Sequence, residues 1–138
     1  KKKYPNIIIV KIEEEKPIAV FNKKGKKFFI SDSSKLISYI EDDNFSDLPN
    51  VFGDESELFL PSFLILLTKK EFPVKEIKNF YFYKIGRWDL DLLNGQLIKL
   101  PYENIENSID QLIQLLQRED FKKYKVIDLR INGKIIAE

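Results

Sequence analysis

The side chains of this 138-residue chain that could take part in chemistry are carboxylates and lysines, because it contains no histidine and no cysteine. Without cysteine there is no thiolate nucleophile, no disulfide and no thiolate metal site. Without histidine, the usual general base, the commonest zinc ligand and the usual partner of a catalytic serine are missing. The composition therefore predicts a protein that is not an enzyme and that holds no metal and no cofactor.

Two groups of carboxylates make a hydrolase an alternative function for this chain. Asp89 and Asp91 alternate along one expected strand, and Glu13–Glu15 follow one another near the N-terminus. A pair of carboxylates can act as general acid and base when the environment raises one of the two pKa values. Alternating acids on one strand face point toward solvent and have no apolar wall that would do this. We therefore favour a role without catalysis.

Lysine clusters make a basic binding surface the other alternative. Lys1–Lys3 open the chain, and four lysines surround Gly25 within Lys23–Lys27. The whole chain has 23 Lys plus Arg against 22 Asp plus Glu, a net charge of +1 that offers no general attraction to nucleic acid. A charged hairpin tip that keeps a sheet edge soluble explains Lys23–Lys27 better, so no nucleic-acid partner is expected.

Hydrophobic periodicity indicates a chain of strands interrupted by two helices. A capping box at Asp54 and Glu57 predicts a buried helix that ends near Lys69, and apolar residues at helical spacing predict an amphipathic helix between Pro101 and Asp120. Residues 31–53 are rich in turn formers and read as the longest loop. Strands are expected at 7–12, 18–21, 28–30, 76–83, 87–92, 96–100, 125–131 and 134–138, the last two as a hairpin that turns at Asn132-Gly133.

The clearest hairpin joins residues 87–92 to residues 96–100 through Asn94-Gly95. A two-residue loop would place apolar residues of one strand opposite charged residues of the other. A three-residue loop at 93–95, with Gly95 left-handed, pairs apolar residues with apolar residues and charged residues with charged residues. It predicts three cross-strand pairs: Trp88 with Leu100, Leu90 with Ile98, and Asp89 with Lys99.

The length leaves room for one domain, or for one domain and a fragment of another. Because the chain has no methionine, it does not begin at its own initiator, and we expect it to be a piece of a longer protein. Its longest apolar run, Leu58–Leu67, is interrupted by Pro61 and Ser62 and is far shorter than the roughly 20 residues that span a bilayer. Any membrane anchor is therefore expected outside this piece.

Four short motifs, in one order, resemble the FtsQ/DivIB family of bacterial cell-division proteins. The first runs from Tyr4-Pro5-Asn6 to Glu13–Val20, like that family's "P-N, strand, E-x-x-P-x-A" junction, and the second, Leu48–Gly53, is like its "LP, two residues, G" element. The third is Arg87–Leu90 through Leu100-Pro101, and the fourth is Val126–Arg130 with Asn132-Gly133. The resemblance extends over nearly the whole chain.

The resemblance implies a fold and a division into two parts. The fold is α+β, with a mixed, largely antiparallel sheet and flanking helices. Residues 1–20 correspond to the end of a POTRA module and its junction, and residues 21–138 to the β domain of the family. Members of the family carry a cytoplasmic tail, one transmembrane helix and the rest of the POTRA module before this part.

The resemblance also implies a function. Family members are non-catalytic scaffolds of the divisome that link early and late division proteins at the septum. They are single-pass proteins of the cell inner membrane, with the β domain on the periplasmic side. That domain binds FtsB, in complex with FtsL, by adding a partner strand to its last strand.

Seven residues are the candidate partner-binding site. The last four strand residues offer free backbone groups at a sheet edge, and Ile131 stands where some family members carry an aromatic contact residue. Arg130 matches the arginine of the family's "DLR" motif and offers a fork for a carboxylate, although a purely structural ion pair is an equal possibility. Arg87 is a weaker candidate, because acidic residues lie close to it in sequence. The complete set is Arg87, Arg130, Ile131, Lys134, Ile135, Ile136 and Ala137.

Overall fold

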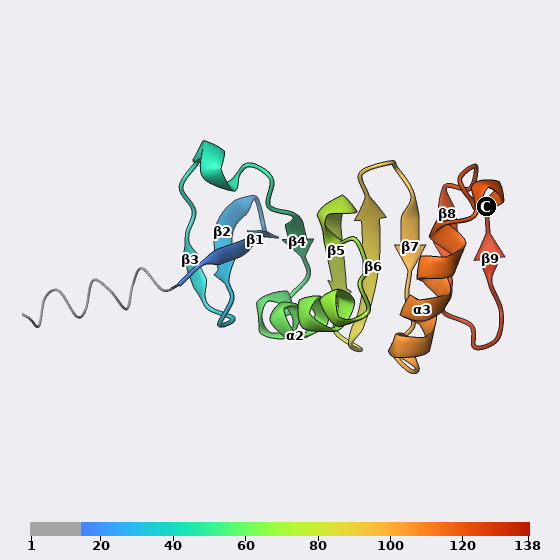
Figure 1. Cartoon of the computed structure of the whole chain (residues 1–138). Coiled ribbons are helices and arrows are strands. Elements are labelled where there is room, and N and C mark those ends of the chain that lie inside the picture. The colour runs from blue at the N-terminus through green and yellow to red at the C-terminus, as the bar shows by residue number, and fades with distance from the viewer. Residues whose placement is uncertain (1–14) are drawn as a thin grey trace, which may run out of the picture.

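The computed structural model describes residues 15–138, and these fold around a single sheet (Figure 1). The expected strand at 7–12 lies outside the described residues. In chain order the elements are β1 (Pro17–Lys23), β2 (Lys26–Ser31), β3 (Leu36–Ser38), the 3-10 helix η1 (Asp43–Phe45), β4 (Asn50–Phe52), α2 (Ser56–Lys69), η2 (Val74–Glu76), β5 (Ile77–Tyr83), β6 (Arg87–Leu92), β7 (Leu97–Lys99), α3 (Ile105–Leu116), η3 (Glu119–Phe121), β8 (Val126–Asp128) and β9 (Ile136–Ala137).

The nine strands of the described residues lie in the order β3-β2-β1-β4-β5-β6-β7-β8-β9. The neighbours β1 and β4, β4 and β5, and β7 and β8 are parallel, and the other pairs are antiparallel. Parallel neighbours need a long crossover connection, and two of the three pairs have a helix as that crossover: α2 joins β4 to β5, and α3 joins β7 to β8. The expected α+β fold with a mixed, largely antiparallel sheet is confirmed.

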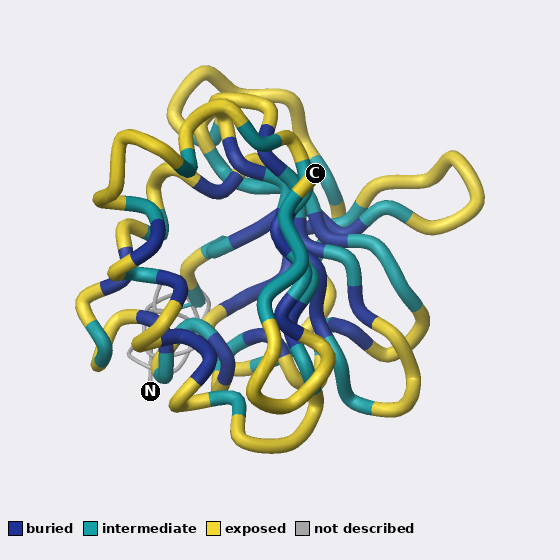
Figure 2. Tube along the Cα trace, turned by 90° about the vertical axis from the view of Figure 1, so that its right-hand side faces the viewer, coloured by how far each residue is buried: buried dark blue, intermediate teal, exposed yellow. Residues whose placement is uncertain are grey.

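Both helices lie against the same face of the sheet, and the hydrophobic core is between them and the strands (Figure 1). Phe63 of α2 stacks on Trp88 of β6 with ring centroids 5.0 Å apart, and Phe80 of β5 meets Trp88 edge-on. From α3, Ile109 and Leu112 are fully buried. In Figure 2 the strands run dark blue through the centre and the loops are yellow.

The predicted hairpin register is confirmed. Leu90 pairs with Ile98 and Asp89 with Lys99, and the N–H of Leu100 donates to the carbonyl of Trp88. The alternation of apolar and charged residues thus predicted the three-residue loop correctly. The two-residue loop would have placed charged residues of one strand opposite apolar residues of the other.

Residues 31–53 are more structured than expected. They contain β3, η1 and the interior strand β4, which pairs in parallel with β1 and β5. The prediction of one long loop was wrong because β4 has only three residues and only Val51 in it is fully buried. So short a strand leaves no periodic signal in the sequence.

The predicted capping box of α2 does not form. The helix begins at Ser56, after Glu55 in a left-handed conformation, and no side chain caps it. The turn comes from Gly53 (φ +118°), whose carbonyl accepts from the N–H of Ser56. Asp54 instead faces two lysines, with Lys23 Nζ at 3.6 Å. The helix does end at Lys69, as expected.

We expect Gly53→Ala to destabilise the domain by about 1–3 kcal/mol. A Cβ there would lie 2.3 Å from the backbone oxygen of Phe82, in addition to the strain of the positive φ. Gly95→Ala is the matched control, because Gly95 (φ +95°) has open space around the same position. Urea unfolding should show the larger loss at Gly53, and equal losses at both glycines would contradict the packing argument.

Candidate functional site

The C-terminal strand β9 forms one edge of the sheet. It pairs with β8 on one side, with Ala137 opposite Ile127 and Ile136 opposite Asp128, and no strand of the described residues lies on its other side (Figure 1). Ile136 and Ala137 are both half-buried. The expectation that the chain ends in an edge strand therefore matches the described structure.

The hydrogen bonds between β8 and β9 decide which backbone groups of the edge are free. The N–H of Glu138 donates to the carbonyl of Val126 (3.0 Å), and the carbonyl of Glu138 accepts from the N–H of Val126 (3.2 Å). In an antiparallel pair such inward-facing residues alternate with outward-facing ones. Glu138 and Ile136 thus face β8, and Ala137 directs its N–H and C=O groups away from the sheet.

The segment before β9 is a loop and not the predicted tight hairpin. β8 ends at Asp128, so neither Arg130 nor Ile131 lies in a strand, and β9 is limited to Ile136–Ala137. The physical reason is an Asx turn: the Asp128 carboxylate accepts from the backbone N–H of Arg130 at 3.0 Å and bends the chain away from the ladder. The predicted turn at Asn132-Gly133 does form, because the N–H of Lys134 donates to the carbonyl of Ile131 across it.

Arg130 is held by Asp128. Its Nε and one terminal nitrogen donate to the two carboxylate oxygens at 2.9 and 2.7 Å, a bidentate pair. The hydrogen bonds from Arg130 hold the pKa of Asp128 below its usual value. The Arg130 side chain is nevertheless 44% exposed, against 13% for Asp128. The arginine therefore has a structural partner and also an open side.

The lowered pKa of Asp128 makes a prediction about acid stability. A carboxylate whose pKa is lower in the folded state contributes stability above its unfolded pKa of about 3.9 and loses it as the pH falls through the folded value. Asp128→Asn keeps the acceptor of the Asx turn but loses the charge. In urea titrations, we expect it to be less stable than the parent at about pH 7 and to converge with it near pH 2.

The control for this comparison is Asp120→Asn. The pKa of Asp120 is also lowered by an arginine, Arg118, but both side chains of this ion pair are more than half exposed. Solvent screening makes such pairs contribute little, so this variant should follow the parent closely at every pH. If the free energy of unfolding of Asp128→Asn differed from that of the parent by the same amount at pH 7 and pH 2, the link between the pKa of Asp128 and acid stability would be contradicted.

Arg87 forms a buried ion pair. Its guanidinium lies 2.5 Å from the carboxylate of Asp89, donates to the carbonyl of Leu100 at 3.2 Å, and stacks over the ring of Tyr83 at 4.4 Å. The two charged side chains are only 12% and 6% exposed. The Tyr83 hydroxyl donates to Asp89, and burial together with that carboxylate raises the pKa of Tyr83. This geometry gives Arg87 a positioning role within the sheet.

The carboxylates considered for hydrolysis that lie within residues 15–138 each have a side-chain partner. Asp89 is balanced by Arg87, and Asp91 accepts from the side-chain amide of Asn79 at 2.9 Å. Of the three glutamates, Glu13 and Glu14 lie outside the described residues, and Glu15 accepts from Ser33, which lowers its pKa. Of the carboxylates that the structure describes, Asp89, Asp91 and Glu15, none stands in an apolar pocket as a free acid.

A cleft of about 400 Å³ lies beside the loop that leads to β9. It brings three of the sequence-predicted residues together, namely Arg87, Arg130 and Ile131, whereas Lys134–Ala137 are not part of its wall. The N-terminal end of α3 and the β5–β6 turn complete it. Its residues are Ile85, Arg87, Pro101, Tyr102, Glu103, Asn104, Asn107, Ser108, Gln111, Leu129, Arg130, Ile131, Asn132 and Gly133.

Two exposed apolar residues of this cleft were missed from the sequence. Ile85 is 70% exposed and Tyr102 is 62% exposed, close to Ile131 at 51%. Gly86 (φ +98°) is packed under the Tyr102 ring, where a Cβ would come within 2.6 Å. The one sequence feature that could have indicated this part of the cleft is Gly86, between Ile85 and Arg87. Its contact with Tyr102 could not be predicted without the fold.

The lysine cluster at Lys23–Lys27 lies away from this cleft. Lys23 and Lys27 belong to the β1–β2 hairpin, near the opposite end of the sheet from β9 (Figure 1), and Lys23 faces Asp54. Lys1–Lys3 lie outside the described residues. In the described part of the chain, no helix is long and apolar enough to cross a membrane.

Comparison with known proteins shows the family to which this chain belongs. The family model for the C-terminal part of the cell division protein FtsQ/DivIB matches residues 19–130. The chain belongs to the FtsQ/DivIB family, a family of non-catalytic proteins of the division machinery.

Individual FtsQ proteins are similar to this chain over nearly all of its length. The chain is 26% identical to the cell division protein FtsQ of Rhizobium radiobacter over 97% of its own length and 65% of that protein, and 28% identical to FtsQ of Rickettsia prowazekii over 96% and 50%. It thus spans about half to two-thirds of these relatives. The major extracytoplasmic domain of DivIB from Geobacillus stearothermophilus gives a TM-score of 0.45 at 13% identity, covering 70% of this chain and 86% of that one.

Proposed function

We propose that this domain is a partner-binding scaffold of the divisome that captures an extended segment of FtsB, in complex with FtsL, by strand addition at β9. The observation that carries the proposal is the free edge of β9, where Ala137 directs its backbone groups outward. Main-chain pairing at such an edge needs few special side chains, which fits a site without catalytic groups.

The cleft beside the β9 loop extends this surface and gives it selectivity. Exposed Ile85, Tyr102 and Ile131 offer apolar contact, and Arg130 offers charge at its open side. A partner that pairs with β9 would place its neighbouring residues near this cleft, since residues 129–133 lead directly to the strand. We infer that the partner presents an apolar side chain and a carboxylate here.

The cellular setting is part of the same proposal. Residues 1–20 are proposed as the end of a POTRA module and its junction, and the domain as lying on the periplasmic side of the inner membrane at the septum. β1 begins at Pro17 and belongs to the same sheet as the rest, so residues 17–20 are structurally continuous with the proposed β domain.

The proposal is tested by calorimetric titration of the 138-residue chain with the extracytoplasmic segments of FtsB and FtsL from the same organism. We expect saturable binding of one copy, with only a modest loss of affinity between low and high salt, because main-chain pairing is not screened as charge contacts are. No binding by the folded chain would overturn the partner assignment. Binding that vanishes steeply with salt would favour the lysine surface instead.

A further inference from the structure

The outer side of α2 carries an exposed, largely apolar stripe. Leu58, Ser62, Ile65 and Lys69 are all exposed, and they follow one another at the spacing of a single helix face. Leu58 is 55% exposed and Ile65 is 68% exposed, and Phe59 beside them is 47% exposed. The buried helix predicted from the sequence is therefore buried on its inner side only.

The outer side of the second helix is different. α3 covers the same face of the sheet (Figure 1), and its exposed residues are all polar: Glu106, Asn107, Asp110, Gln111 and Gln114. A helix that packs on a sheet normally has such a polar outer side. The apolar stripe is thus particular to α2, and apolar side chains exposed together mark an interaction surface.

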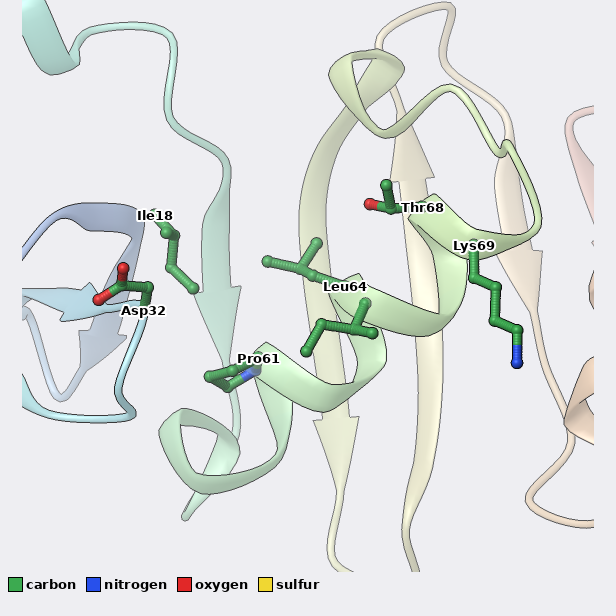
Figure 3. A pocket seen from close by; sticks show the side chains of 7 residues that line it. Ile18, Asp32, Pro61, Leu64, Thr68 and Lys69 are labelled. Atoms are coloured by element: carbon green, nitrogen blue, oxygen red, sulfur yellow. The ribbon is translucent and has the colours of Figure 1, made fainter.

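An apolar groove of about 570 Å³ runs beside the stripe, between α2 and the start of β1. Ile18 of β1 stands on one side of it, and Pro61, Leu64 and Thr68 of α2 stand on the other (Figure 3). Ile65 belongs to both the stripe and the wall of the groove. The stripe is therefore next to a hollow that accepts an apolar side chain from outside.

The two ends of the stripe carry opposite charges. Glu55 immediately precedes α2, and Lys69 is its last residue. Both are exposed, and within residues 15–138 neither forms an ion pair, whereas their neighbours Asp54 and Lys70 both do. At 1.5 Å per helical residue, the two charges lie about 21 Å apart along the helix. The stripe thus offers one acid and one base, each available to another molecule.

This pattern is complementary to itself when two copies of α2 run antiparallel. With a two-fold axis near Ser62, Leu58 of each copy meets Ile65 of the other, and Glu55 meets Lys69. Parallel helices would instead place like charges opposite each other. The small side chain of Ser62 at the axis allows the two helices to approach closely. The charges and the apolar residues therefore favour the same occupant, a second copy of this chain.

We propose that the outer side of α2 is a self-association surface, on which two copies of this chain pair with their α2 helices antiparallel. The contact removes Leu58, Phe59 and Ile65 of both copies from water. An apolar patch on the order of a few hundred Å² per copy is typical of a weak, reversible dimer. The surface includes no residue of β9 or of the cleft beside it, so both copies keep their edge strands free.

Sedimentation equilibrium of the 138-residue chain tests for the dimer. We expect a monomer–dimer equilibrium with a dissociation constant of about 10–500 µM. Ile65→Lys should weaken association at least about tenfold, because it places a charge in the apolar contact. Gln114→Lys is the control, since it adds the same charge to the exposed side of α3. A chain that stays monomeric up to about 1 mM would overturn the proposal.

Charge reversal tests the antiparallel arrangement and separates a second copy from any other occupant. Glu55→Lys and Lys69→Glu should each weaken association by about threefold to tenfold, because each brings like charges together twice across the two-fold axis. The double variant should recover most of the affinity, since it restores both pairs with their signs exchanged. Trp88 fluorescence verifies that each variant is folded. No recovery in a folded double variant would contradict antiparallel pairing.

Disulfide trapping locates the two-fold axis, and the absence of native cysteine gives it a clean background. Oxidised Ser62→Cys should form a covalent dimer at least about tenfold faster than Gln114→Cys, because the axis brings its two Cβ atoms within bonding distance. Equal rates would overturn the proposal. Ala137→Pro should dimerise as the parent does, so that a failure of self-association is distinguishable from a failure of partner binding at β9.

Discussion

Replacing Ala137 with proline should weaken FtsB binding by about tenfold to a hundredfold while leaving the domain folded. Proline removes the N–H that Ala137 directs outward, and its ring occupies the space of the incoming strand. Loss of one main-chain hydrogen bond costs about 1 kcal/mol, and the steric conflict adds to it. The fold is spared because Ile136 and Glu138, not Ala137, face β8. Calorimetric titration measures the affinity, and Trp88 fluorescence monitors folding.

Ala137→Ser is the matched control, because it retains the N–H and adds only one small atom. It should bind as the parent does. Ile136→Pro provides the opposite case: its N–H faces β8, so it should lower the thermal midpoint. If Ala137→Pro bound the partner as tightly as Ala137→Ser, strand addition at β9 would be excluded.

Replacing Arg87 with alanine should unfold much of the population at moderate temperature. The Asp89 carboxylate would remain buried without its counter-charge, and breaking a buried ion pair from one side typically costs about 3–5 kcal/mol. For a domain of this size, that lowers the thermal midpoint by roughly 10–20 °C. Differential scanning calorimetry would measure it directly.

Arg130→Ala is the comparison for Arg87→Ala. Its ion pair with Asp128 is partly exposed and screened by solvent, so a loss below about 1 kcal/mol is expected. Arg87→Met combined with Asp89→Leu should recover most of the stability, since it removes both buried charges together. A midpoint for Arg87→Ala within a few degrees of the parent would show that Arg87 has no structural role.

The long elements and the best hairpin could be predicted from the sequence because their patterns are strong. The register of β6 and β7 followed from matching charged with charged residues and apolar with apolar. β4 escaped prediction because a three-residue strand has no period to detect, and its place in the sheet is decided by the crossover through α2. The predicted cap at Asp54 failed because the turn at Gly53 takes precedence over side-chain capping.

The candidate site was predicted in part. The sequence indicated that the last strand is an edge, but not that β9 is limited to Ile136–Ala137. The Asx turn at Asp128 uses the same aspartate and arginine that suggested partner binding, and only the fold shows that they bind each other. Tyr102 was missed because nothing in its local sequence marks its contact with Gly86.

The most direct test of strand addition is amide hydrogen exchange in the complex. We would record exchange of the chain alone and then with the FtsB and FtsL segments, residue by residue. We predict strong new protection at Ala137, whose N–H faces outward, and little change at Ile136 and Glu138, which already face β8. Saturated binding with the amide of Ala137 still exchanging freely would contradict strand addition at β9.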